Sequence, residues 1–198
     1  MPVEVDYSKT AWGDESVRMH TDPPMYLLGA CVFDNAEHET FRNLENLKPK
    51  GAGKLHWREL SINDQGKSLE LIAALPHTTS IVVASPLEKN KQERARRKCL
   101  ELLLAHLDQK GIELLVLESR DSHLDRLDNV ILFAMRQSRT IFNIDIRHSQ
   151  GQGEPRLYVP DQILGAYGDV TAHNQSSQKW QPHWENVRNN ITELNVRL

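Results

Sequence analysis

Residues 26–33 read Tyr-Leu-Leu-Gly-Ala-Cys-Val-Phe, a short continuous apolar run that is typical of a strand buried on both faces of a sheet. A second nearly continuous apolar run, Ile-Glu-Leu-Leu-Val-Leu-Glu over residues 112–118, has the same character. Further strands are expected over residues 3–14, 78–85 and 141–146, where apolar or β-branched side chains alternate or gather. We therefore expect a sheet whose central strands are covered on both sides.

Helix patterns separate these strands. The clearest helix is expected over residues 88–109, where apolar side chains recur every three or four positions, at Ala95, Cys99, Leu102, Leu103 and Leu107. The other expected helices span residues 35–47, residues 69–75, a segment capped by Asp121 or Ser122, and a segment from Pro160 onward. Strands that alternate with helices predict an α/β domain, and right-handed crossovers would place the helices over both faces of the sheet.

The composition is typical of a globular protein, with 39% hydrophobic and 26% charged residues among 198. This length suits one domain over residues 1–198, in which the pattern leaves residues 174–198 as a C-terminal extension of undecided structure. The net charge of −3 predicts no general attraction to nucleic acid. Cys31 and Cys99 lie in apolar segments and are expected to be core thiols in a reducing compartment.

No segment predicts export or membrane insertion. The first residues, Met-Pro-Val-Glu-Val-Asp, lack the basic and then apolar pattern of a signal peptide. No apolar run approaches the roughly 18 residues that a membrane-spanning helix needs. We therefore expect a cytoplasmic protein without a membrane partner.

Three carboxylates lie where an α/β fold gathers functional groups at one edge of its sheet. Asp14, in the segment Ala-Trp-Gly-Asp-Glu-Ser, and Glu118 come at the expected carboxyl ends of strands, whereas Asp161 begins a helix. Glu59 is a possible fourth acid. Hard divalent cations such as Mg²⁺ take oxygen ligands, so these acids could hold a metal that promotes phosphoryl transfer.

Each acid also has a purely structural explanation. Asp14 and Glu15 could form a polar turn, and Glu118 could be solvated beyond its strand or pair with Arg120. Asp161 could simply favour the amino end of its helix through the helix dipole. The spacing alone leaves both explanations open.

Other site chemistries lack their sequence patterns. The chain has no phosphate-binding P-loop, no dinucleotide-binding fingerprint and no nucleophile elbow. Its nine histidines lack the spacing of a metalloprotease, and two cysteines cannot form a zinc ribbon. The acids are therefore the main candidates for chemistry.

Short segments in the same order resemble signatures of the DUF3800 family. Asp14-Glu15-Ser16 resembles the family's DES(G) opening, and Leu55-His56, ahead of Glu59, resembles its LH segment after a glycine-rich loop. Residues 114–118 resemble its apolar strand that ends in an acid, and residues 158–166 resemble its helix with the pattern LQxADxxAGA. The resemblance covers most of the chain.

DUF3800 proteins are regarded as RNase H-like in fold and as metal-dependent nucleases. The resemblance therefore implies an RNase H-like mixed sheet with helices on both faces, and hydrolysis of nucleic acid with Mg²⁺ or Mn²⁺. It implies Asp14, Glu118 and Asp161 as metal ligands, with metal-bound water as the nucleophile. Glu15 and Glu59 are weaker catalytic candidates.

Two further features could serve a nucleic-acid substrate. His56 could position a phosphate or a water molecule or carry a proton, or it could be an ordinary polar loop residue. Residues 89–98 hold three Lys and three Arg against one Glu. Lys91, Arg94 and Lys98 share a helix face opposite the apolar stripe, so they could contact a phosphate backbone or be a solvated face.

Two other classes of function stay open. The same fold with a weakened site could hold nucleic acid or a protein partner without cleaving it, since Glu118 and Val17 replace the aspartate and glycine usual in the family. A purely structural role would involve neither metal nor nucleic acid. Metal-dependent turnover distinguishes a nuclease from both, and the sequence favours neither RNA nor DNA.

Overall fold

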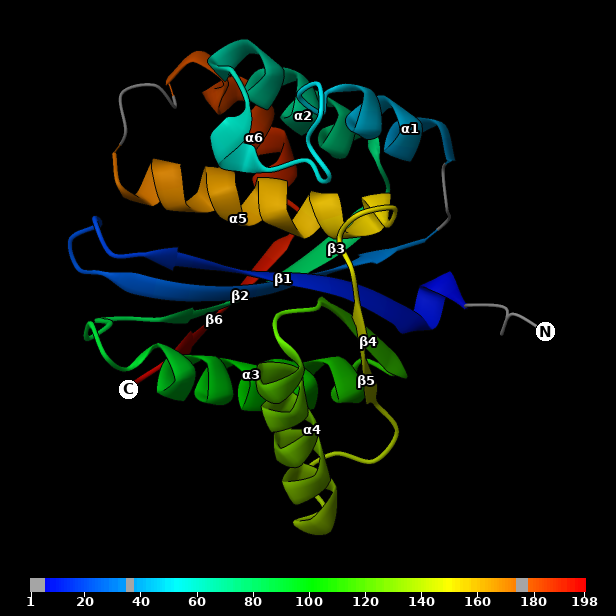
Figure 1. The fold of residues 1–198 in the computed structure, drawn as a ribbon, viewed down its shortest axis with the longest axis vertical. Helices are drawn as coiled ribbons and strands as arrows, with labels where there is room; N and C mark the ends of the chain where they lie inside the picture. Colours follow the sequence, from blue (N-terminus) through cyan, green and yellow to red (C-terminus); the bar gives the residue numbers. More distant parts are fainter. Residues whose placement is uncertain (1–5, 35–37, 174–177) are drawn as a thin grey trace.

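The computed structural model describes residues 6–34, 38–173 and 178–198, which form one mixed sheet in the order β5-β4-β1-β2-β3-β6 (Figure 1). The strands are β1 (Thr10–Arg18), β2 (Met25–Phe33), β3 (His77–Ala84), β4 (Leu114–Glu118), β5 (Asp145–Ser149) and β6 (Ile191–Val196). β2 is antiparallel to β1 and β3, while the β1–β4, β4–β5 and β3–β6 pairs are parallel. The α/β prediction is confirmed, and this mixed sheet is consistent with an RNase H-like fold.

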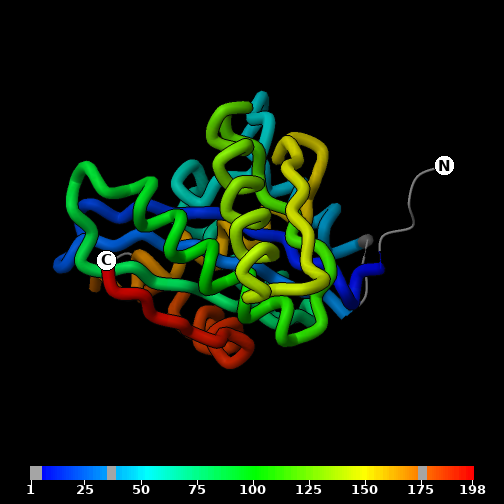
Figure 2. The backbone as a smooth tube through the Cα atoms, turned by 90° about the horizontal axis from the view of Figure 1, so that it is seen from below, coloured from blue at the N-terminus to red at the C-terminus, as the bar shows by residue number. Residues whose placement is uncertain are grey.

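Helices cover both faces of the sheet, as expected. On one face α5 (Tyr158–Thr171) packs on β1 and β2, and α1 (His38–Asn46), α2 (Ile62–Ala74) and α6 (Gln181–Arg188) lie beyond it (Figure 1). On the other face α3 (Gln92–Gln109) packs on β2 and β3, and α4 (Ser122–Gln137) packs on α3 (Figure 2). Short 3-10 turns occur at η1 (Tyr7–Lys9), η2 (Trp57–Glu59) and η3 (Pro155–Leu157).

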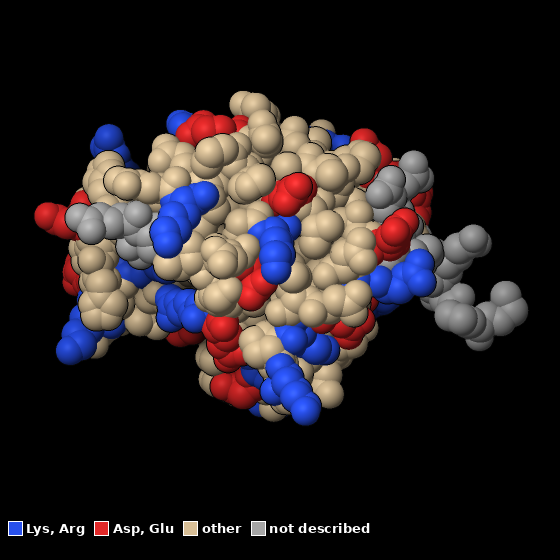
Figure 3. Space-filling view, turned by 90° about the horizontal axis from the view of Figure 1, so that it is seen from above, with Lys and Arg blue, Asp and Glu red and all other residues tan. Residues whose placement is uncertain are grey.

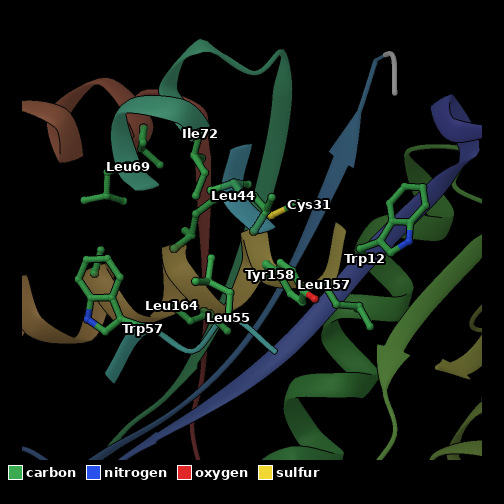
Figure 4. Packing of buried hydrophobic residues seen from close by; sticks show 14 of the residues in the cluster. Trp12, Cys31, Leu44, Leu55, Trp57, Leu69, Ile72, Leu157, Tyr158 and Leu164 are labelled. Atoms are coloured by element: carbon green, nitrogen blue, oxygen red, sulfur yellow. The ribbon is translucent and has the colours of Figure 1, made fainter. Parts of the chain in front are cut away.

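Two apolar clusters, one on each face of the sheet, hold these layers together. Trp12 and Leu164 belong to the cluster around α5 (Figure 4), and Leu28 and Leu103 belong to the cluster between the sheet and α3. Gly29 lets α5 approach the sheet, because a Cβ there would lie 2.9 Å from a Leu164 methyl carbon. Each fully buried leucine stabilises the fold by roughly 1.5–3 kcal/mol relative to an exposed one, so these clusters fix where α5 and α3 lie.

β1 lies further along the chain than the strand expected over residues 3–14, of which residues 1–5 lie outside the described residues. Asp14 is therefore in the middle of β1, paired with Gly29 of β2, and the expectation that it ends a strand is wrong. The parallel pairing of β1 with β4 nevertheless ends at Gly13 and Leu117. Asp14 is thus the first residue of β1 beyond that pairing, which still places it where two parallel strands separate.

β5 also differs from the expected strand over residues 141–146, since it spans Asp145–Ser149. Ile141 and Ile144 are buried in the connection that precedes the strand. Asp108 accepts hydrogen bonds from the backbone N–H groups of residues 142, 143 and 144 at 2.8–3.1 Å. This carboxylate satisfies backbone donors that would otherwise need a strand partner, so an apolar run here is not a strand.

The segment treated as a C-terminal extension belongs to the same domain where it is described. Residues 174–177 lie outside the described residues, but Trp180 and Trp184 are buried at 1% and 2% exposure, and α6 packs on α2. β6 then pairs with β3 in parallel and completes that edge of the sheet.

The surface gives no large region of one charge on the face in Figure 3, where basic and acidic side chains are interspersed. In the described ranges no helix combines the length and apolarity needed to cross a bilayer. Leu127 of α4 is 37% exposed, while Leu132 and Met135 are buried.

Candidate functional site

Asp14 is the most buried of the predicted acids. Alternation along β1 turns its side chain toward the face that α5 covers, and the residue is only 9% exposed. A carboxylate that far from water is unfavourable unless a cation or several hydrogen bonds compensate it. The surroundings of Asp14 supply such a cation.

Lys54 bridges Asp14 and Glu118. Its Nζ donates a hydrogen bond to Asp14 Oδ2 at 2.9 Å and another to a carboxylate oxygen of Glu118. Glu118 is the last residue of β4, the parallel neighbour of β1, so both acids lie at the same break in strand pairing. One ammonium group therefore joins carboxylates from two adjacent strands.

The charges around Lys54 shift one another's pKa. Burial raises the pKa of Asp14 to about 7; the Lys54 ammonium opposes this rise, and the Asp161 and Glu118 carboxylates add to it. Burial lowers the pKa of Lys54, but Asp14, Asp161 and Glu118 outweigh burial and raise it above its ordinary value. The three acids therefore act as one electrostatic unit around Lys54.

Buried neighbours fix the position of Lys54. Leu55 and Trp57, the first and third residues after it, are 0% and 2% exposed (Figure 4). Gly151 provides the space beside it: a Cβ at Gly151 would overlap Glu118 Oε1 and lie 2.7 Å from Lys54 Cδ. The Lys54–Glu118 contact thus depends on a glycine from the β5–η3 connection.

Asp161 lies in the first turn of α5, as the sequence predicted. Its Oδ2 accepts hydrogen bonds from the Trp57 backbone N–H at 2.8 Å and from Gln162 Nε2 at 3.0 Å. His56 Nδ1 lies 3.8 Å from Asp161 Oδ1. The Asp161 carboxylate raises the pKa of His56, while burial acts in the opposite direction. Asp161 thus fixes the segment that carries Lys54 and His56.

All of the sequence-predicted catalytic residues line one cleft of about 490 Å³: Asp14, Glu15, His56, Glu59, Glu118 and Asp161. Glu59 is exposed and His56 is partly exposed, whereas Asp14 is buried. Lys54, Arg18 and Arg58 also line the cleft and bring positive charge among the acids. The cleft is therefore a mixed-charge site open to solvent.

Glu15 differs from the other acids because two partners already hold its carboxylate. Arg96 Nη1 lies 2.6 Å from Glu15 Oε2, and the Tyr26 hydroxyl donates a hydrogen bond to the same oxygen. Alternation along β1 turns Glu15 toward α3, the opposite side from Asp14. Glu15 is thus an ion-pair partner of α3 and not a member of the acid cluster around Lys54.

Arg96 also belongs to a buried network of charged side chains between α3 and α4. Its guanidinium makes two hydrogen bonds to Asp128, at 3.0 and 2.7 Å, and His148 Nε2 lies 3.0 Å from the same carboxylate. Burial raises the pKa of Asp128, but the hydrogen bonds from His148 and Arg96 outweigh burial and lower it to about 2. The network anchors the helix layer behind the cleft.

The basic side chains of residues 89–98 have different surroundings. Arg96 is buried in the network just described, and Lys98 Nζ donates a hydrogen bond to the Arg197 carbonyl oxygen at 2.9 Å. Lys91 and Arg94 are exposed, but neither they nor Lys98 line the cleft. Nucleic-acid contact through Lys91, Arg94 and Lys98 stays a prediction.

The carboxylates that line the cleft are suitable ligands for a hard divalent cation, but two of them, Asp14 and Glu118, already contact Lys54. Asp14, Glu118 and Asp161 offer the carboxylate oxygens that Mg²⁺ and Mn²⁺ prefer. Over the described part of the chain, no three His, Cys, Asp or Glu side chains are grouped so that they could hold an ion as they stand. The Lys54 ammonium occupies the position between Asp14 and Glu118.

The cations of the site were missed by sequence reasoning. Lys54 gives only a weak signal, a basic residue between a glycine-rich loop and the apolar Leu55. Arg18, at the end of β1, donates hydrogen bonds to Asp169 at 3.1 Å and to the Gly165 carbonyl oxygen at 2.7 Å, which ties β1 to α5. Neither contact follows from sequence spacing.

A comparison with models of known protein families finds no match to this chain, and a comparison with curated proteins finds none either. The resemblance to DUF3800 therefore stays a prediction. The function has to be inferred from the cleft itself.

Proposed function

We propose that this chain hydrolyses phosphodiester bonds in a nucleic acid, with Mg²⁺ or Mn²⁺ as cofactor. The observation that supports the proposal is that Asp14, Glu118 and Asp161, from β1, β4 and α5, all line one cleft. Carboxylates that repel one another are costly to gather, and a bound divalent cation repays that cost.

Asp14 of β1, Glu118 of β4 and Asp161 in the first turn of α5 are the residues that would hold the cation. When bound, such an ion activates water and neutralises charge on the phosphate. His56 lies beside Asp161 in the open part of the cleft, so it can carry a proton to or from the reacting oxygens. Arg58 lines the same cleft, is exposed, and can contact a substrate phosphate.

The test is a cleavage assay on a panel of single- and double-stranded DNA and RNA, with Mn²⁺ and with EDTA. We expect cleavage only with the metal, and a loss of about a hundredfold or more in Asp14→Asn and Glu118→Gln. Glu113→Gln is the matched control, because Glu113 is exposed, pairs with Lys9 and lies outside the cleft. Cleavage that persists in EDTA, or in folded Asp14→Asn, contradicts the proposal.

A binding protein that does not cleave is the second candidate, and the Lys54 bridge is the observation that favours it. An ammonium that always neutralises Asp14 and Glu118 would leave no position for a metal between them. Oligonucleotide binding without turnover in any divalent cation would support this alternative.

A further inference from the structure

We infer that Lys54 is a built-in competitor for the divalent cation, so that the Lys54 bridge and metal binding are alternative states of one site. The inference rests on the proposed function, because it concerns the cation which that function requires. It starts from one observation: Lys54 Nζ contacts the carboxylates of both Asp14 and Glu118.

The two states exclude each other. The ammonium lies 2.9 Å from Asp14 Oδ2, and the other oxygen of this carboxylate already accepts a hydrogen bond from the Glu15 backbone N–H at 2.7 Å. Mg²⁺ binds carboxylate oxygens at about 2.1 Å, so ion and ammonium would overlap and repel if both faced the same oxygens. Asp14 and Glu118 can therefore face the ammonium or the metal, but not both.

The closed state is a specific arrangement and not a chance surface contact. The Lys54 side chain is 6% exposed, whereas that of Lys67, which pairs with Asp64, is 61% exposed. Leu55 and Trp57 are buried directly after Lys54, and Gly151 leaves room for its stem against Glu118. These contacts place the ammonium between the two acids.

The open state has space beside it. The cleft next to Lys54 has a volume of about 490 Å³, and the exposed Glu59 also lines it. The flexible four-carbon side chain of Lys54 can therefore move into this space. A displaced ammonium stays tethered in the cleft, where a substrate phosphate is a natural partner. The apparent metal affinity then falls in proportion to the fraction of molecules in which the site is open.

The test measures Mn²⁺ affinity by calorimetry in the wild type, Lys54→Gln, Lys54→Arg and the charge control Lys67→Gln. Lys54→Gln should bind Mn²⁺ at least about tenfold more tightly, as expected if fewer than one wild-type molecule in ten is open. Lys54→Arg keeps the competing charge and should stay within a few-fold of the wild type. Lys67→Gln should leave the affinity unchanged.

A second measurement needs no variant and separates displacement from a simple change of charge. The wild type is labelled with an N-hydroxysuccinimide ester with and without saturating Mn²⁺, and labelled lysines are quantified by mass spectrometry. Labelling of Lys54 should rise with Mn²⁺ relative to Lys67, whose amine is exposed in either state.

The outcomes distinguish this inference from the proposed function. If the wild type binds Mn²⁺ and Lys54→Gln binds no tighter, or Lys54 labelling does not rise, the competitor role is overturned while the proposed function stands. Binding by Lys54→Gln alone, both with and without an oligonucleotide, supports the competitor role and contradicts a metal-dependent activity of the wild type. Absence of binding in both folded proteins under both conditions overturns both.

Discussion

Asp14 shows how a single buried charge shapes the site. Its carboxylate is almost out of water, and burial raises its pKa to about 7 against the pull of Lys54. Replacing one partner of such a pair leaves the other charge buried and uncompensated. Asp14 and Lys54 are therefore coupled in stability as well as in any function of the cleft.

Gly151 allows a test of the contact between Lys54 and Glu118 from outside the charged groups. A Cβ at this position would overlap Glu118 Oε1 and lie too close to Lys54 Cδ. Gly151→Ala should therefore push Lys54 and Glu118 apart. We expect the free energy of unfolding to fall by about 1–3 kcal/mol, the usual cost of overpacking, in urea denaturation.

Gly53→Ala is the matched control for Gly151→Ala. Gly53 immediately precedes Lys54, and the nearest atom to a Cβ there would be 3.8 Å away, at Gln152. Its free energy of unfolding should therefore stay within about 0.5 kcal/mol of the wild type. Equal effects of the two substitutions would show that Gly151 has no special role beside Lys54 and Glu118.

At the scale of elements, β1 carries adjacent acids to opposite faces of the sheet. Asp14 faces the cleft and Lys54, while Glu15 pairs with Arg96 of α3. Arg96 in turn pairs with Asp128 of α4. β1 thus connects the cleft to the helix layer behind it, and the position of Asp14 depends on both.

Asp128→Asn tests how much the buried network between α3 and α4 contributes to the stability of the fold. Asp128 and Arg96 are 0% and 3% exposed, so the substitution leaves Arg96 buried with a weaker partner. We expect a loss of about 3–5 kcal/mol in the free energy of unfolding at pH 7. Glu101→Gln, which removes an exposed pair with Arg97, should cost no more than about 0.5 kcal/mol.

The same variant has a defined pH dependence. The pKa of Asp128 is about 2 in the folded chain, below its ordinary value of 3.8, so its stabilising contribution is present above pH 3.8 and is lost as the pH falls toward 2. The difference in free energy of unfolding between the wild type and Asp128→Asn, measured by urea denaturation, should therefore become smaller as the pH falls over that range. A constant difference would mean that the network does not depend on the ionised carboxylate.

At the scale of the whole molecule, the sequence predicts the layers better than the contacts between them. The run over residues 26–33 is β2 as expected, because a strand buried on both faces leaves a continuous apolar signal. The helix expected from residue 69 begins earlier, at Ile62, since its first turns are polar and are specified by the Ser61 cap. The spacing of apolar residues does not show where a helix with polar first turns begins.

The residues of the candidate site could likewise be predicted only in part from the sequence. Asp14, Glu118 and Asp161 line one cleft, as the sequence suggested, although Asp14 lies within β1, where its pairing with β4 ends, and not at the end of a strand. Lys54 and Arg96 could not be predicted from the sequence, since each reaches its acids across the fold from a distant segment. A lysine in a loop and an arginine in a basic helix look the same in sequence whether they are solvated or buried.

The most direct test of the central claim is a calorimetric titration of Mn²⁺ into the wild type and Asp14→Asn, with circular dichroism to show that both are folded. A metal held by Asp14, Glu118 and Asp161 predicts binding by the wild type that is lost in Asp14→Asn and kept in Glu113→Gln. Equal binding by the wild type and Asp14→Asn, or no binding by the wild type even with an oligonucleotide present, would contradict the account.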